Sequence, residues 1–121
     1  MEKLVIIPTY NEKENIQHII AAVFALDKQF HILIIDDNSP DGTASIVKSL
    51  FAKYPGQLFL EERKGKLGLG TAYIHGFKWA LAQKESTGKN KYDYIFEMDC
   101  DFSHNPADLT RLLEACEKGE F

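Results

Sequence analysis

Four short apolar runs constrain the fold of this 121-residue chain most. Each run is followed by a turn and then by a segment with helical spacing. The runs lie at residues 4–7, 30–35, 57–62 and 94–101. Short continuous apolar runs are typical of strands buried on both faces, as in a parallel sheet. We therefore expect an α/β fold, a three-layer α/β/α sandwich with a mostly parallel sheet and right-handed crossovers.

The segments between these runs carry the apolar spacing of amphipathic helices. The first expected helix begins at Asn11 and Glu14, which fit a capping box, and buries one face from Ile16 to Phe24. The later helices are expected at residues 43–54, 73–81 and 106–118. Because strand and helix alternate four times, the whole chain is expected to form one domain at most.

Composition and charge argue against several functions. A net charge of -4 provides no basic surface for nucleic acid. No apolar run approaches the roughly 20 residues that cross a bilayer, and the first residues lack a signal-peptide pattern, so we expect a cytoplasmic protein. Cys100 and Cys116 have neither CxxC nor zinc-site spacing, and we expect both to be reduced thiols in the core.

Two carboxylates at the end of the fourth run are the strongest chemical signal. Side chains alternate along a strand with a rise of roughly 3.3 Å, so Asp99 and Asp101 would point the same way and Cys100 into the core. Carboxylates held about 6.6 Å apart at their Cα atoms favour a bound cation, and oxygen ligands suit Mg²⁺ or Mn²⁺. The Asp-x-Asp pair predicts a metal site, although Asp is also common where turns and caps begin.

The loops that follow the four expected strands are all chemically rich. Ligands of an open parallel sheet bind beyond the carboxyl ends of its strands, where these loops converge. Acids, cations and glycines on one edge suit a nucleotide that bears a pyrophosphate. Each part also has a plainer explanation: Tyr10 as packing, Asp36 and Asp37 as turn formers, and the lysines of residues 63–70 as a solvated surface.

Four segments carry a resemblance to a known family. They are residues 8–15 (PTYNEKEN), 36–43 (DDNSPDGT), 68–76 (GLGTAYIHG) and 98–106 (MDCDFSHNP). Together they resemble the family 2 inverting glycosyltransferases of GT-A fold, and within them the dolichol-phosphate or polyprenol-phosphate mannosyltransferases. The segments span nearly the whole chain in the family's order, and the last two are the more specific to this branch.

The resemblance implies transfer of mannose from GDP-mannose to a polyprenyl (dolichyl) phosphate at a membrane surface, with inversion and with Mg²⁺ or Mn²⁺. The residues implied to line the nucleoside pocket are Pro8, Tyr10, Glu12, Ile35 and Asp37. Asp99 and Asp101 are implied as the catalytic, metal-ligating acids, and Cys100 as a donor contact through its backbone. At residues 100 and 102 the chain has Cys and Phe where the family often has Ala and Leu.

The family continues beyond this length with further strands and an acceptor region. We therefore expect residues 1–121 to be the nucleotide-sugar (donor) binding part of a GT-A domain that is truncated at its C-terminus, in a full-length protein that is peripheral at the cytoplasmic membrane face. The sequence gives no indication of the oligomeric state.

Other interpretations stay open. One is a UDP-glucose-dependent polyprenyl-phosphate glucosyltransferase or another family 2 transferase. Another is a phosphoryl-transfer domain like the haloacid-dehalogenase phosphatases, which carry the acidic pair on their first strand and Thr or Val where this chain has Ser103. Asp36 and Asp37 also resemble response-regulator receivers. The last is a non-catalytic nucleotide-binding module.

Overall fold

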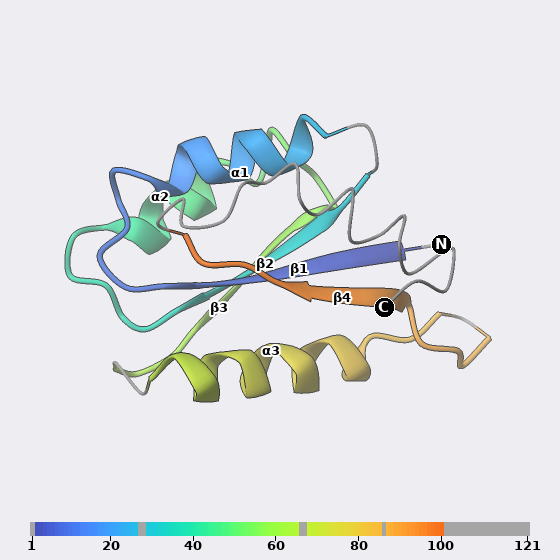
Figure 1. Cartoon of the computed structure of the whole chain (residues 1–121). Helices are drawn as coiled ribbons and strands as arrows, with labels where there is room; N and C mark the ends of the chain where they lie inside the picture. Colours follow the sequence, from blue (N-terminus) through green and yellow to red (C-terminus); the bar gives the residue numbers. More distant parts are fainter. Residues whose placement is uncertain (1, 27–28, 66–67, 86, 101–121) are drawn as a thin grey trace.

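The computed structural model describes residues 2–26, 29–65, 68–85 and 87–100. Its elements in chain order are β1 (Glu2–Thr9), α1 (Ile16–Phe24), β2 (His31–Asp36), α2 (Thr43–Ser49), β3 (Leu58–Glu62), α3 (Leu69–Ala82) and β4 (Tyr92–Glu97). Figure 1 shows the sheet between α1 and α2 on one face and α3 on the other. The predicted three-layer α/β fold is confirmed.

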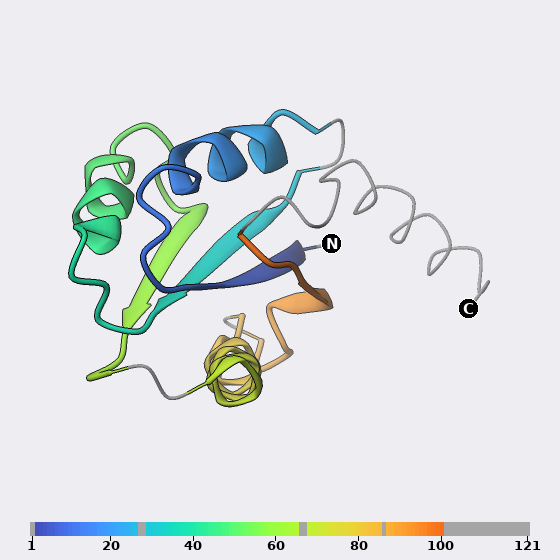
Figure 2. The same cartoon turned by 60° about the vertical axis from the view of Figure 1, so that its left-hand side comes forward.

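The four strands form one sheet in the order β3-β2-β1-β4, and every neighbouring pair is parallel. The register between β1 and β2 runs from Leu4 opposite His31 to Thr9 opposite Asp36. In Figure 2, α3 is seen nearly along its axis, across the sheet from α1 and α2. Because all strands run the same way, the loops that leave their carboxyl ends lie at one edge of the sheet.

Alternate strand residues supply two separate cores, one on each face of the sheet. The core under α1 and α2 contains Val5, Ile7, Ile32, Ile34, Ile16, Ile19, Ile20, Val23 and Val47. The core under α3 contains Leu4, Ile6, Leu33, Ile35, Ala72 and Ala80. This alternation follows from the two-residue period of a strand, and it explains why β1 and β2 read as continuous apolar runs.

Helix α3 lies unusually close to the sheet at Gly76. A Cβ atom added to Gly76 would lie 2.7 Å from Cγ2 and 2.8 Å from Cδ1 of Ile6, on the central strand β1. Such distances are well inside van der Waals contact, so a glycine is required here by packing.

At the amino-terminal edge of the sheet, His31 lies between two hydrogen-bonding partners. Its Nδ1 is 3.0 Å from the hydroxyl of Tyr92 and its Nε2 is 3.1 Å from Oε2 of Glu2. Burial, helped by the charge of Glu2, raises the pKa of Tyr92, so the phenol stays protonated and donates to Nδ1. The Nε2–H then donates to Glu2. Burial is also the main influence on His31 and lowers its pKa below 6.5, against an opposing effect of Glu2.

Helices α1 and α2 differ from the prediction. Helix α1 begins at Ile16, with Asn15 as an N-cap whose side chain makes no capping bond. The predicted capping box at Asn11 is wrong, because Asn11 has a left-handed backbone with φ of 55°. Helix α2 ends at Ser49 instead of residue 54, because the amides of residues 50 and 51 bond back only three residues and tighten the chain into turns.

Strand β4 also differs from the prediction of a buried strand. It lies at an edge of the described sheet, and Tyr92 is its one buried residue. The strand ends at Glu97, so Asp99 lies just beyond it. Asp101, Cys116 and the helix expected at 106–118 lie outside the described residues. Among the helices that the structure describes, none has the length and apolar character needed to span a membrane.

Candidate functional site

The loops that leave β1, β2 and β3 begin in contact at the carboxyl edge of the sheet. The amide of Asp37 donates to the carbonyl of Thr9 at 3.1 Å, and the amide of Arg63 donates to the carbonyl of Asp36 at 2.8 Å. On the other side of β1, the amide of Met98 donates to the carbonyl of Ile6 at 3.1 Å. These bonds extend the strand ladders past the strand ends, so the first residues of the loops are held by the sheet.

An ion pair between Asp37 and Arg63 links the second and third loops. Arg63 donates from Nε to Oδ1 at 2.6 Å and from Nη2 to Oδ2 at 2.9 Å, and the two side chains are 7% and 8% exposed. The same guanidinium donates to Oγ1 of Thr71 at 3.0 Å and to the carbonyl of Gly68 at 3.2 Å. The planar, five-donor guanidinium thus ties the Asp37 loop to the beginning of α3.

Helix α3 also reaches the acidic end of the fourth run. The hydroxyl of Tyr73 donates to Oδ1 of Asp99 at 2.9 Å. Thr71 and Tyr73 are two residues apart in α3, so one turn of this helix contacts both Arg63 and Asp99. Asp37 and Asp99 therefore lie at the same edge of the sheet, with the first turns of α3 between them.

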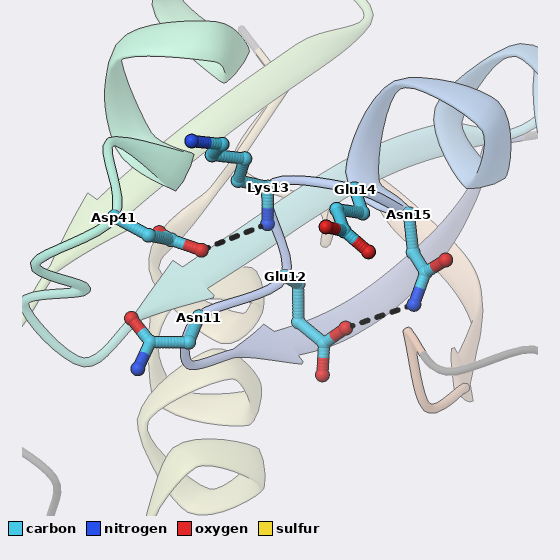
Figure 3. A pocket seen from close by; sticks show the side chains of 6 residues that line it. All are labelled: Asn11, Glu12, Lys13, Glu14, Asn15 and Asp41. Carbon is cyan, nitrogen blue, oxygen red and sulfur yellow. Dashed lines mark hydrogen bonds between the residues drawn. The ribbon is translucent and has the colours of Figure 1, made fainter.

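The first loop is held by side chains of the second. The amides of Asn11, Glu12 and Lys13 donate to three different oxygen atoms. Their acceptors are Oγ of Ser39 at 2.9 Å, Oγ1 of Thr43 at 3.0 Å and Oδ2 of Asp41 at 3.1 Å, respectively. Figure 3 draws the bond between Lys13 and Asp41. Consecutive amides of one loop are thus satisfied by three side chains from the next.

Asp36 is the buried centre of the second loop. Its carboxylate is fully buried and accepts hydrogen bonds from the hydroxyl of Thr9 at 2.7 Å, the amide of Ser39 at 2.9 Å and the hydroxyl of Ser39 at 2.7 Å. Three donors compensate the cost of burying the carboxylate. Asp36 therefore fixes the turn that follows β2, while Asp37 faces Arg63.

The carboxylate of Asp41 is stabilised in its charged form by its neighbours. Burial alone would raise its pKa, but hydrogen bonds from the Thr43 hydroxyl and from the amides of Lys13 and Thr43, with the charge of Lys13, lower the pKa below 3.8. Asp41 is thus a carboxylate at neutral pH, able to accept from both loops.

A polar pocket of about 410 Å³ opens between the first loop and Asp41 (Figure 3). Its lining residues are Asn11, Glu12, Lys13, Glu14, Asn15 and Asp41. Within it, Nδ2 of Asn15 donates to Oε2 of Glu12 at 3.2 Å, which orients the Glu12 carboxylate. Of the residues predicted to contact a donor, Glu12 is the one that lines this pocket.

The other predicted site residues differ in their accessibility. Pro8 is half-buried and Tyr10 is exposed, both on the first strand and its loop. Ile35 is fully buried in the core under α3, so its side chain is not available to a ligand and only its main chain could make a contact. Cys100 is buried in the core under α1 and α2, as predicted.

The predicted metal site lies only partly within the described residues. Asp99 is described and half-buried, whereas Asp101 is not described. In the ranges that the structure describes, no three His, Cys, Asp or Glu side chains are grouped so as to hold a metal ion. The carboxylate of Asp99 is an oxygen ligand of the kind that Mg²⁺ and Mn²⁺ prefer, and the bond from Tyr73 orients it.

Sequence reasoning did not identify Arg63 or Tyr73 as site residues. Arg63 comes directly after the third strand, and Tyr73 lies in the first turns of the following helix. Arg63 could have been identified as a cation at the end of the strand that neighbours the strand of Asp37. That inference requires the order of the strands in the sheet, which the sequence does not give.

The chain belongs to glycosyltransferase family 2, because the model of the family described as "Glycosyl transferase family 2" matches residues 4–121. This membership decides against the phosphatase and receiver interpretations.

Two curated relatives define the similarity more closely. The chain is 44% identical over 116 residues to polyprenol monophosphomannose synthase of Mycolicibacterium smegmatis, covering 96% of the chain and 41% of that protein. It is 42% identical over 115 residues to undecaprenyl-phosphate mannosyltransferase of Micrococcus luteus, covering 95% of the chain and 44% of that protein. The chain thus spans less than half the length of the curated relatives it matches.

Solved structures are similar in fold. The mannosyltransferase PcManGT of Pyrobaculum calidifontis, solved in complex with GDP-Man and Mn²⁺, matches with a TM-score of 0.61 and 28% identity over 65% of this chain and 24% of that one. S. aureus TarS matches with a TM-score of 0.74 and 23% identity over 98% of this chain and 33% of that one, a likeness of fold alone. The predicted GT-A fold class is confirmed by this likeness.

Proposed function

We propose that this protein transfers mannose from GDP-mannose to a polyprenyl (dolichyl) phosphate with inversion at the anomeric carbon, and that residues 1–121 form the donor-binding part of its catalytic domain. The observation that carries the proposal is the identity of 44% and 42% to two polyprenyl-phosphate mannosyl-transferring proteins over almost the whole chain. The GDP-Man complex of a structural relative supports the choice of donor.

The donor nucleoside is proposed to bind at the carboxyl edge of the sheet, against Pro8, Tyr10, Glu12 and Asp37. Support comes from their common location at the carboxyl ends of β1 and β2 and on the loops that follow, which backbone hydrogen bonds hold in contact. Ile35 would contribute through its main chain, because its side chain is buried. Cys100 would likewise contact the donor through its backbone, since its side chain packs in the core.

Asp99 and Asp101 are proposed to hold a divalent cation, Mg²⁺ or Mn²⁺. The Mn²⁺ in the PcManGT complex supports this choice. When bound, such a cation supplies Lewis-acid stabilisation of the negative charge on the leaving diphosphate. The hydroxyl of Tyr73 would orient Asp99, because it donates to Oδ1 and leaves Oδ2 for a further partner.

The acceptor requires little help from the protein to become a nucleophile. A phosphate monoester has a second pKa near ~6, so it is largely a dianion at neutral pH. The proposed reaction therefore needs no strong general base, in contrast with transfer to a sugar hydroxyl. Because a polyprenyl chain resides in a membrane, we infer that the protein works at the cytoplasmic membrane face.

The test uses the full-length protein with radiolabelled GDP-mannose or UDP-glucose and a polyprenyl phosphate. Label is expected in the lipid fraction from GDP-mannose, with inverted anomeric configuration by NMR. Transfer from UDP-glucose alone would overturn the proposed donor and favour the glucosyltransferase alternative. Failure of both donors would overturn the proposed donor and leave the alternatives of another family 2 transferase or a nucleotide-binding module without transfer.

The metal assignment is tested by calorimetry of GDP binding with Mn²⁺. Asp101→Ala is expected to abolish the metal-dependent part of the affinity. Asp93→Ala is a matched control, because Asp93 is an exposed carboxylate of β4 near its amino end. Unchanged GDP affinity in Asp101→Ala would count decisively against the metal site.

A further inference from the structure

The first loop, which carries Tyr10 and Glu12, is supported from within at its helix end, where the amides of Asn15 and Ile16 donate to the carbonyl of Glu12 at 3.0 and 2.8 Å. Helix α1 begins only at Ile16, so the amides of residues 11–13 lie before the helix and are not part of its hydrogen-bond ladder. Asn11 has a left-handed backbone, a conformation that a non-glycine residue adopts at a cost unless its surroundings enforce it. The amides of residues 11–13 therefore take their partners from outside the loop.

Two side chains of the second loop, Ser39 and Asp41, and Thr43 at the start of α2 are these partners. Ser39, Thr43 and Asp41 accept hydrogen bonds from the amides of residues 11, 12 and 13, respectively, at 2.9, 3.0 and 3.1 Å. The amide of Asn11 thus pairs with Ser39, that of Glu12 with Thr43 and that of Lys13 with Asp41. This contact joins residues about 30 positions apart, so it is a specific tertiary contact and not a local turn.

Both hydroxyls in this contact have a fixed direction. The hydroxyl of Ser39 donates its proton to the buried Asp36 at 2.7 Å, and the hydroxyl of Thr43 donates to Asp41 at 2.6 Å. Since each proton is directed to a carboxylate, each oxygen presents a lone pair to an amide. Hydrogen bonds in such chains polarise one another, so the contact is stiffer than isolated hydroxyl bonds would be.

We propose that Ser39, Asp41 and Thr43 are positioning residues for the nucleotide-sugar donor: by holding the amides of residues 11–13 they set the first loop, with Tyr10 and Glu12, before the donor binds. This inference rests on the proposed function. Thr43 is fully buried and acts on the donor through the loop, not by contact. A loop that is already ordered loses less conformational entropy when a ligand binds, and that saving appears as affinity.

The test is the kinetics of Thr43→Val, Thr43→Ser and Ser39→Ala in the full-length protein. Thr43→Val keeps the branched shape but removes the hydroxyl, whereas Thr43→Ser keeps the hydroxyl. We expect Thr43→Val and Ser39→Ala to raise the KM for GDP-mannose about tenfold, with kcat changed far less and the KM for polyprenyl phosphate unchanged. Thr43→Ser is expected to restore the wild-type KM.

A matched control removes a hydroxyl elsewhere in the same helix. Ser49 is exposed and its hydroxyl donates to the carbonyl of Ile46 at 2.6 Å, away from the first loop. Ser49→Ala is expected to leave both KM values unchanged. If Thr43→Val alters the KM for donor and acceptor equally, or if Thr43→Ser fails to restore the donor KM, the positioning role is overturned.

Amide hydrogen exchange tests the contact without any donor. Exchange at residues 11–13 is expected to be faster in Thr43→Val and Ser39→Ala than in the wild type and in Ser49→Ala. Unchanged exchange would overturn the inference even if both variants were impaired. A wild-type protein that does not use GDP-mannose would overturn the proposed function instead, whereas an active wild type with unchanged variant kinetics would overturn only this inference.

Discussion

Substituting Gly76 by alanine tests how tightly α3 is packed on the sheet. The added Cβ would lie 2.7 Å from Cγ2, 2.8 Å from Cδ1 and 3.1 Å from Cγ1 of Ile6. Two of these atoms, Cγ1 and Cγ2, are bonded directly to the Cβ of Ile6, so no rotation at the end of the side chain can relieve the contacts. The fully buried Ile6 must shift, or α3 must move away from β1.

The expected magnitude follows from two opposing effects. Alanine is favoured over glycine inside a helix by about 1 kcal/mol. Overpacking a well-packed core costs about 1–3 kcal/mol, and we expect the upper part of this range, about 2–3 kcal/mol, because three atoms are involved. We therefore expect Gly76→Ala to lower the free energy of unfolding by roughly 1–2 kcal/mol in spite of its better helix propensity.

Gly70→Ala is the matched control in the same helix. Gly70 lies in the first turn of α3, and no atom of the described residues lies within 4 Å of a Cβ built there. Its substitution is expected to be neutral or to stabilise by up to ~1 kcal/mol. The free energies of unfolding of the two variants, measured by urea denaturation of the protein, should thus change in opposite directions or differ by at least about 1 kcal/mol.

A second mutation separates packing from propensity. Ile6→Val removes Cδ1, one of the three close atoms, and leaves Cγ2 in place. The cost of Gly76→Ala should therefore be smaller in the Ile6→Val background, with a measurable coupling energy in the double-mutant cycle. Equal stability of Gly76→Ala and Gly70→Ala, together with zero coupling to Ile6→Val, would refute the close approach of α3 to β1.

Three further predictions concern individual groups. Burial lowers the pKa of His31 below its ordinary value of 6.5, so in acid the unfolded state binds a proton that the folded state does not. The free energy of unfolding, measured by urea denaturation, should therefore be highest well above pH 6.5 and should decrease as the pH falls through 6.5, and His31→Phe should lose this dependence. Arg63→Ala should lower the free energy of unfolding by about 3–5 kcal/mol, because it leaves the buried Asp37 without its partner, and Arg63→Lys should lower it less. Unchanged free energies of unfolding in both variants would contradict the buried ion pair. Tyr73→Phe should weaken Mn²⁺-dependent GDP binding by about tenfold in calorimetry, and unchanged affinity would mean that its bond to Asp99 orients no ligand.

Local patterns predicted the elements well where burial dominates. The runs at 4–7 and 30–35 became the central strands because apolar side chains on both faces have no other way to be buried between two layers of helices. The start of α1 was predicted wrongly because the capping-box pattern at Asn11 is local, whereas Ser39, Asp41 and Thr43 take up the amides of this loop from a distant part of the chain.

The convergence of the loops also followed from the sequence, since any parallel sheet brings its carboxyl ends to one edge. The side-chain contacts made at that edge could not be predicted from the sequence. Arg63 meets Asp37 because β3 pairs with β2, and Tyr73 meets Asp99 because α3 crosses beneath β1 and β4. Both contacts depend on strand order and on which face of the sheet a helix covers, and neither is encoded in the spacing of residues along the chain.

The position of α3 connects the packing of the core with the geometry of the site. Thr71 accepts from Arg63 at 3.0 Å and Tyr73 donates to Asp99 at 2.9 Å, and both belong to the helix that Gly76 allows to approach β1. A hydrogen bond of this length is lost once its atoms separate by about 0.6 Å more. A Cβ at Gly76 calls for a displacement of similar size to reach ordinary contact. A substitution in the core should therefore disturb Asp37 and Asp99 together, through one helix and without touching either carboxylate.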